Sequence, residues 1–382
     1  MEGQKLVDTA DQLIAAGDIK QAIEVYKEAL AELQKSGDGA GEATVLGNIG
    51  NAYLYLSEID QSLKAYKSAL SLSEKLGNKR LISATYNNMG NVLSAIGRLQ
   101  EALEYYEKAM KLYQELDNAK GIGNVLNNLG AIYSNMGDAD KSIAYYQKAL
   151  QLSKELGDTK GQGQRLANLA NSYAELQRYD EALLLYEQAK IISDKMADQR
   201  GQAIIATNLA SIHQIRGEYQ KSILLSNEAL SLFRKIGDRL NEAGVLGNLG
   251  NVYQNLGDLQ QALSYYAQAL QLAEITGVPR IQAHQLGNLG NASMAKGEYL
   301  NAEKYYQKAI VIFKTIGDRR GEGVTIANLG SVYKFQGKKE LALSCFDEAA
   351  AILRQLGQSV EYKLHEIAAL RNELESGLLV TQ

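Results

Sequence analysis

The chain has 382 residues, 46% of them hydrophobic, and a formal net charge of −4. This near-neutral charge does not favour general binding of nucleic acid, which requires a strongly basic surface. No stretch approaches the roughly 18 consecutive apolar residues of a membrane span, and the amino terminus lacks the apolar run of a signal peptide. A single cysteine, Cys345, fits a reducing compartment. We therefore expect a cytoplasmic protein that neither binds nucleic acid nor inserts into a membrane.

An asparagine returns every 40 residues, within phrases such as LGNIGNAY at 46–53 and LGNLGNVY at 246–253. A fixed period of this length, kept without a slip, is typical of repeat proteins whose units share one continuous core. The recurring residues are Asn48, Asn88, Asn128, Asn168, Asn208, Asn248, Asn288 and Asn328.

Each unit contains two amphipathic segments. In the unit 43–82, residues 46–53 place apolar side chains at the i, i+3, i+4, i+7 spacing of one helix face, and residues 63–72 do so again after a break at 57–60. Units are separated by a glycine followed by Asp or Asn, as in Gly37-Asp38; the glycine can close one helix and the next residue can cap the following one. The pattern predicts two helices per unit, with Pro279 in a first helical turn.

Small and aromatic residues also recur in phase. Glycine or alanine on the first helix allows close approach of the second, and tyrosines on the second helix are expected to fill the space between them as core residues. The small series is Gly50, Gly90, Gly130, Ala170, Ala210, Gly250, Gly290 and Gly330, and the aromatic series is Tyr26, Tyr66, Tyr106, Tyr146, Tyr186, Tyr266 and Tyr306.

This pattern resembles the tetratricopeptide repeat, whose order of residues is matched by Leu246, Gly250, Tyr253, Ala262, Tyr266 and Ala269. The unit of 40 residues is longer than the usual 34, and its phrases are similar to those of the Leu-Gly-Asn repeat/Partner of Inscuteable scaffolds and of bacterial repeat scaffolds. The resemblance implies an all-α, right-handed superhelical solenoid of antiparallel helix pairs. It does not extend to the G-protein-binding motifs of the Partner of Inscuteable type.

Extending the period predicts nine units over residues 1–357, then a capping helix at 358–376 and an unassigned tail at 377–382. The predicted units are 3–42, 43–82, 83–122, 123–162, 163–202, 203–242, 243–282, 283–322 and 323–357.

The asparagines are the first candidates for a binding site. The resemblance implies that they lie on the concave face of the solenoid, where an amide can both donate to and accept from a peptide backbone. The other interpretation is structural, with each asparagine bonded to a neighbouring repeat. A second series of asparagines lies one helical turn after the first and supports the same interpretation. Its members are Asn51, Asn91, Asn171, Asn251 and Asn291.

A series of cations recurs just after the junctions between units. A positive charge in the first turn of a helix interacts unfavourably with the helix dipole, at a cost of ~0.3–1 kcal/mol. Each cation should therefore have a compensating partner. That partner is either a carboxylate of the next unit or an acidic ligand. The series is Arg80, Lys120, Lys160, Arg200, Arg280 and Arg320, and apolar pockets are expected at Leu54, Tyr55, Ile215 and Phe335.

Catalytic signals are weak. The phrase HEIAA at 365–369 resembles a zinc-protease motif but has Ala369 where the second histidine is required. We expect no enzyme activity, no metal and no cofactor. The favoured function is a scaffold or adaptor whose concave groove binds an extended or helical, acidic peptide segment of a partner protein. The alternatives are a regulator that changes shape on binding a ligand or peptide, and a self-associating scaffold. No sequence feature indicates an oligomeric state.

Overall fold

The computed structural model describes residues 2–356 and 360–376, and these ranges contain only helices and turns. The prediction of an all-α helical solenoid is confirmed. The predicted boundary at 357–358 and the tail at 377–382 lie outside the described residues.

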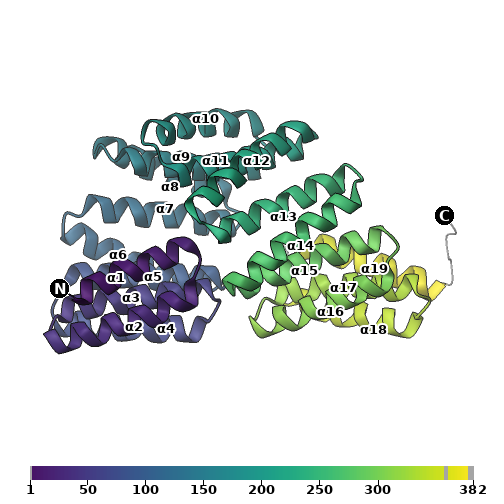
Figure 1. The fold of residues 1–382 in the computed structure, drawn as a ribbon, viewed down its shortest axis with the longest axis horizontal. Coiled ribbons are helices and arrows are strands. Elements are labelled where there is room, and N and C mark those ends of the chain that lie inside the picture. The colour runs from purple at the N-terminus through teal and green to yellow at the C-terminus, as the bar shows by residue number, and fades with distance from the viewer. Residues whose placement is uncertain (1, 357–359, 377–382) are drawn as a thin grey trace. The chain divides into compact units, whose positions relative to one another are not determined.

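The chain divides into two compact units, residues 1–239 and 240–382. In unit 1, six antiparallel helix pairs follow one another along the chain (Figure 1). Its helices are α1 (Glu2–Ala16), α2 (Ile19–Ser36), α3 (Gly39–Tyr55), α4 (Ile59–Lys75), α5 (Lys79–Ala95), α6 (Leu99–Glu115), α7 (Ala119–Asn135), α8 (Ala139–Glu155), α9 (Thr159–Glu175), α10 (Tyr179–Lys195), α11 (Gln199–Ile215) and α12 (Tyr219–Ile236).

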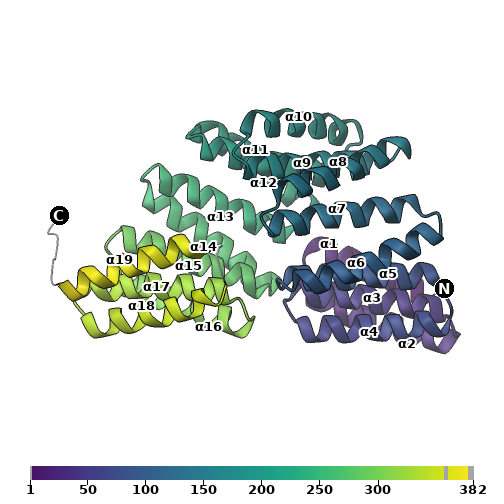
Figure 2. The ribbon, with the colours of Figure 1, turned by 180° about the vertical axis from the view of Figure 1, so that it is seen from behind.

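Unit 2 repeats this arrangement and ends with an additional helix, visible from the other side in Figure 2. Its helices are α13 (Arg239–Asn255), which starts at the boundary, α14 (Leu259–Thr276), α15 (Pro279–Ala295), α16 (Tyr299–Thr315), α17 (Arg319–Phe335), α18 (Lys339–Arg354) and α19 (Glu361–Ser376). The helix α19 packs against α17 and α18, at the place where a capping helix was predicted.

The turns have a period of their own, 20 residues, with a left-handed residue at every turn from Gly17 to Gly337. Thirteen of these residues are glycines, which adopt positive φ without strain, and the others are Ser57, Asp117, Gln177 and Ala197. The predicted caps are confirmed: the Asp38 carboxylate, for example, accepts a hydrogen bond of 2.9 Å from the amide of Gly41. Pro279 lies in the first turn of α15, as predicted.

The predicted core pairs are also confirmed. A Cβ on Gly50 would lie 2.8 Å from the ring of Tyr66, and one on Gly250 would lie 2.4 Å from the ring of Tyr266. Both rings are almost fully buried. Glycine is therefore what lets each ring fit between the two helices of its pair.

Candidate functional site

All the predicted asparagines and cations lie on the first helices of the pairs, α3 through α17 with odd numbers. We call the surface that carries them the first-helix face. From the second pair onward, each helix pair begins four residues before the predicted start of its unit, as α5 does at Lys79. This places the cations at the second residue of their helices, for example Arg80 in α5.

The second asparagine series holds the core tyrosines. In each case the tyrosine hydroxyl of the second helix donates to the side-chain carbonyl of an asparagine on the first helix of the same pair. The bonds are Tyr66 to Asn51 (2.5 Å), Tyr106 to Asn91 (2.6 Å), Tyr266 to Asn251 (2.7 Å), Tyr306 to Asn291 (2.6 Å) and Tyr186 to Asn171. A hydroxyl that is bonded in this way can be buried without losing a hydrogen bond.

The first series is half-buried, and five of its members bond to the preceding repeat. Asn48 and Asn208 bond to the hydroxyls of Tyr26 and Tyr186. The Asn128 amide donates to the carbonyls of Asn87 (2.9 Å) and Asn91 (3.0 Å). The equivalent donors in two other repeats are Asn168, to Asn127 at 2.8 Å, and Asn328, to Asn291 at 3.2 Å. For Asn88, Asn248 and Asn288 the described residues provide no hydrogen-bond partner. The structural interpretation thus accounts for part of the series, while the contact of the series with a ligand stays a prediction.

Asn128 and Asn88 form a matched pair for measuring this structural contribution. We expect Asn128→Ala to lower the free energy of unfolding by about 1 kcal/mol, because two inter-repeat hydrogen bonds are lost. The substitution Asn88→Ala removes no such bond and should change stability by less than about 0.5 kcal/mol. Chemical denaturation of both variants checks this expectation, and equal losses would contradict it.

The predicted cations are all exposed, and two of them pair with the next repeat. The Arg200 guanidinium lies 3.1 Å from the carboxylate of Asp238, and that of Arg280 lies 4.0 Å from Asp318. Within residues 2–356 and 360–376, the other four make no ion pair: Arg80, Lys120, Lys160 and Arg320. These four charges are available to a ligand.

Unit 1 has a pocket of about 430 Å³ on the first-helix face. Ile192, Met196 and Ile204 form apolar walls, while Lys160 and Arg200 contribute positive charge. Tyr55, at the end of α3, lines the same pocket, although it is more than 100 residues from the others in sequence. The first-helix face of unit 1 is therefore concave. Periodicity alone did not reveal the contribution of Ile192 and Met196, which come from the end of a second helix.

Unit 2 has a pocket of about 370 Å³ on its own first-helix face. It brings together four of the predicted residues, and it is lined on one side by Tyr362 of the additional helix α19. The four residues are Asn288, Asn291, Arg320 and Asn328.

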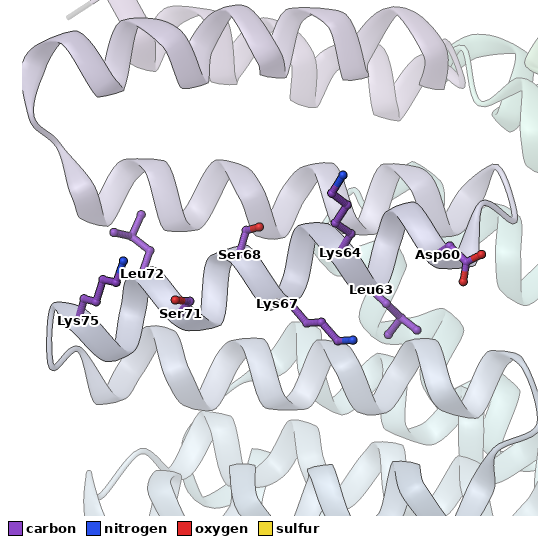
Figure 3. Close-up of a pocket in the computed structure, with 8 residues that line it drawn as sticks. All are labelled: Asp60, Leu63, Lys64, Lys67, Ser68, Ser71, Leu72 and Lys75. Atoms are coloured by element: carbon purple, nitrogen blue, oxygen red, sulfur yellow. The ribbon is translucent and has the colours of Figure 1, made fainter.

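A wider hollow of about 570 Å³ lies along α4 (Figure 3). All the residues that line it belong to this one helix, including Lys64 and Lys67, whose side chains project in different directions in the figure. It contains none of the predicted site residues. A surface formed by a single helix does not enclose a ligand, so we do not assign it a binding role.

The predicted apolar positions differ from one another. Tyr55 lines the pocket of unit 1, whereas Phe335 stacks on Tyr299, with ring centroids 5.6 Å apart. Leu54 packs against the apolar cluster that contains Tyr66 of α4 and Met89 of α5. Ile215, by contrast, is 63% exposed. Ile215 therefore contributes exposed apolar surface and lines neither of the two pockets on the first-helix face.

Other chemical signals are few. Burial raises the pKa of the half-buried Cys345 thiol to about 11, which leaves it protonated at neutral pH. Among the described residues, no group of three or more His, Cys, Asp or Glu side chains is placed to hold a metal ion. No helix in this part of the chain has the length and apolar character needed to cross a bilayer.

Comparison with solved structures finds the same fold in several proteins. The chain is similar to a signal transduction ATPase with numerous domains (STAND) protein with a tetratricopeptide repeat sensor from Pyrococcus horikoshii, with a TM-score of 0.57 and 18% identity, over 87% of this chain and 54% of that one. It is also similar to a Rap protein complexed with competence and sporulation factor, with a TM-score of 0.55 and 15% identity, over 88% and 98% of the two chains. A third is the Rap conjugation gene regulator of the plasmid pLS20 in complex with the Phr* peptide, with a TM-score of 0.55 and 19% identity, over 70% and 72%. At these identities the likeness concerns the fold alone.

The search of curated proteins found no significant match. Two family models do match, and both describe the tetratricopeptide repeat. One matches residues 5–75, 42–115, 81–134, 121–190, 201–275 and 282–355, and the other matches residues 248–315. The chain therefore belongs to the tetratricopeptide repeat family.

Proposed function

We propose that this chain is a non-enzymatic protein-interaction module that binds an acidic peptide segment of a partner on its first-helix face. The pocket of unit 1 carries this proposal, because it combines apolar walls with unpaired positive charge in a concave surface. Two of the solved structures with this fold are Rap proteins in complex with a peptide or with competence and sporulation factor.

The shape and composition of the pocket favour an apolar anchor residue. Ile204 is 39% exposed and Met196 is 44% exposed, so a ligand side chain would bury apolar surface that is now in water. Burial of such surface contributes about 25 cal/mol per Å². Tyr55 would contact the ligand from the opposite side, and a ring loses little conformational freedom on binding.

The charge of the pocket favours an acidic neighbour to that anchor. Lys160 and Arg200 contribute positive charges to the lining and Asp198 a negative one, and Arg200 is already paired with Asp238. The Asp198 carboxylate already accepts a hydrogen bond of 3.0 Å from the amide of Gly201, whereas Lys160 has no ion pair among the described residues. Lys160 is therefore the cation that we expect to contact a ligand carboxylate.

A displayed library of random dodecapeptides would test the proposal. We expect selection on the intact chain to enrich peptides with an apolar residue next to Asp or Glu. Their affinity for Ile204→Asp should fall by more than about tenfold, because a charge then occupies the apolar wall. Lys160→Glu should weaken binding by a factor that decreases as salt is added.

The matched control is Leu224→Asp. Leu224 is 71% exposed on α12 and does not line the pocket. This variant should bind the selected peptides as the intact chain does. Enrichment of no peptide, or equal loss of affinity in both variants, would contradict the proposal.

A further inference from the structure

The pocket of unit 2 differs chemically from that of unit 1. About half of its lining residues are polar or charged, and one of these is a histidine, His284 on α15. At the equivalent position the other repeats have residues that do not titrate near neutral pH, such as Asn124, Gln164 and Ile204. His284 is thus a feature of this one site.

Two side-chain carbonyls that line the pocket, those of Asn291 and Asn328, are already occupied. The Asn291 carbonyl accepts from Tyr306 (2.6 Å) and from Asn328 (3.2 Å). The Asn328 carbonyl accepts from the ammonium group of Lys363, at 3.3 Å. Within residues 2–356 and 360–376, the pocket groups without a partner include the guanidinium of Arg320 and the amide of Asn288, so N–H donors outnumber the one free side-chain amide carbonyl.

These free donors favour an anion. The Arg320 guanidinium and the Asn288 amide make no ion pair or hydrogen bond among the described residues. The one carboxylate in the wall, Asp318, accepts from the amide of Gly321 at 2.8 Å and lies 4.0 Å from Arg280. It is already engaged by these two groups, which leaves Arg320 to interact with a ligand.

His284 can add a further positive charge. Its ring is open to the pocket and meets the Phe313 ring edge to face, with centroids 5.2 Å apart. The protein that surrounds the ring on its other sides desolvates it and lowers the pKa of His284, while Asp318 raises this pKa and Arg280 lowers it. Among the described residues, two other charges belong to the walls of the pocket or adjoin them: Arg320, which lines it, and Lys363 of α19, which donates to Asn328 and pairs with Glu366 at 2.8 Å. Arg319 and Glu322 pair with each other at 2.6 Å.

We propose that this pocket is a second binding site, which accepts a carboxylate next to an aromatic side chain in a peptide and binds it more tightly when His284 is protonated. Arg320 and Asn288 would donate to the carboxylate, and Tyr362, which is 64% exposed, would pack against the aromatic ring. The inference rests on the proposed function only in that the ligand arrives as an acidic peptide. The site itself belongs to the other unit and is tested separately.

The direction of the pH effect follows from linkage. The neutral imidazole dominates in the free pocket, and a bound carboxylate stabilises the charged imidazolium, so the pKa of His284 rises on binding. Affinity therefore increases as pH falls from about 7.5 to about 5.5, over which range a carboxylate remains ionised. Each unit by which binding raises the pKa corresponds to an affinity ratio of about ten between the two protonation states.

The chain contains only three histidines, so their ring signals can be followed by NMR in the intact protein. The probe is the dipeptide Ac-Asp-Phe-NH2, and its neutral match is Ac-Asn-Phe-NH2. We expect the acidic probe to raise the pKa of His284 and to bind several-fold more tightly at the lower pH. An unchanged pKa of His284 with millimolar probe, or equal binding of the neutral probe, would overturn the proposal.

Two variants separate binding from folding. Gly287 lines the pocket, and a Cβ there would meet no atom within 4 Å, so Gly287→Leu should fill the pocket and abolish binding without loss of thermal stability. Its match is Gly47→Leu in unit 1, where a Cβ also meets open space, and this variant should bind normally. Unaltered probe binding by the stably folded Gly287→Leu would sink the assignment of the site.

The role of His284 itself is tested by His284→Gln. This variant should bind the acidic probe with the affinity of the intact protein at high pH and show no increase at low pH. A retained increase would overturn the role of His284. Tighter binding of phenyl phosphate than of the acidic dipeptide at the higher pH would overturn the choice of a carboxylate. The variant Ile204→Asp should bind the probe normally, so failure of the unit 1 proposal and failure of this one are distinguishable.

Discussion

Replacing Gly121 by leucine is expected to destabilise unit 1 by about 3 kcal/mol, near the upper end of the usual cost of overpacking. A Cβ at Gly121 would lie 2.4 Å from the ring of Tyr113, which is 8% exposed. The repeat before it has the reverse arrangement of sizes, with Ser73 and Leu81 at the equivalent positions. One large residue and one small residue therefore share this space in each case.

The second substitution should restore part of the stability. Tyr113→Ser alone removes a buried ring and should cost about 3–5 kcal/mol. In the double variant Tyr113→Ser/Gly121→Leu, which recreates the Ser73 and Leu81 pairing, the loss should be smaller than the sum of the two single losses by about 1–3 kcal/mol. Native-state hydrogen exchange of α6 and α7 measures this locally, which matters because repeat arrays do not unfold in two states. Additive losses would contradict the shared-space explanation.

The fold could be predicted because the same helix, turn and packing residues recur every 40 residues. Gly250 and Tyr266 recur together, and a glycine of positive φ such as Gly237 recurs at the junctions, so the sequence identifies the pairs and their connections. Hydrogen-bond partners could not be predicted in this way. Asn88 and Asn128 occupy equivalent positions, yet only Asn128 makes two inter-repeat bonds. The repeat before Asn128 supplies Asn87 as an acceptor where the repeat before Asn88 has Gly47, while Asn51 matches Asn91 and makes no bond with Asn88. The partner of an amide depends on the neighbour's side chains rather than on its own place in the repeat.

The two pockets could not be predicted from the sequence, for a different reason. Lys160 and Arg200 could be recognised as a series, but the approach of Tyr55 depends on how far successive helix pairs rotate. A small rotation per repeat accumulates over several repeats, and no single residue encodes it. Tyr362 was missed because it belongs to the additional helix, which has no counterpart in the period. Exposed aromatic residues outside the repeat are the signal that could have found it.

Raising the pH is expected to unfold unit 1 between about pH 10 and pH 12, because its core tyrosines cannot ionise while buried. Burial raises the pKa of Tyr146 to about 12 and raises that of four other tyrosines of this unit well above the ordinary value of 10.0: Tyr26, Tyr66, Tyr106 and Tyr186. In the unfolded chain these phenols lose their protons near pH 10, so the unfolded state then binds fewer protons than the folded state. Stability is therefore complete below the unfolded pKa and is lost as the pH rises toward the folded values.

The size of the effect follows from the number of groups. Each tyrosine lowers the free energy of unfolding by about 1.4 kcal/mol per pH unit in this range, and five together lower it by about 7 kcal/mol per pH unit. A typical total stability of about 5–15 kcal/mol would be exhausted within about two pH units. The chain has no tryptophan, so tyrosinate absorbance and helical circular dichroism report ionisation and unfolding separately. We expect both signals to change together.

The variant Tyr106→Phe distinguishes tyrosine ionisation from a simple loss of packing, because only ionisation makes its stability relative to the intact protein depend on pH. It keeps the ring but loses the hydroxyl bond of 2.6 Å to Asn91, so at neutral pH it should be about 1 kcal/mol less stable than the intact protein. Because it also removes one ionising group, its stability falls less steeply with pH, and the difference should vanish about one pH unit above the onset of ionisation. Ionisation of all the tyrosines near pH 10 with the helices intact would show instead that solvent reaches these rings in the folded state.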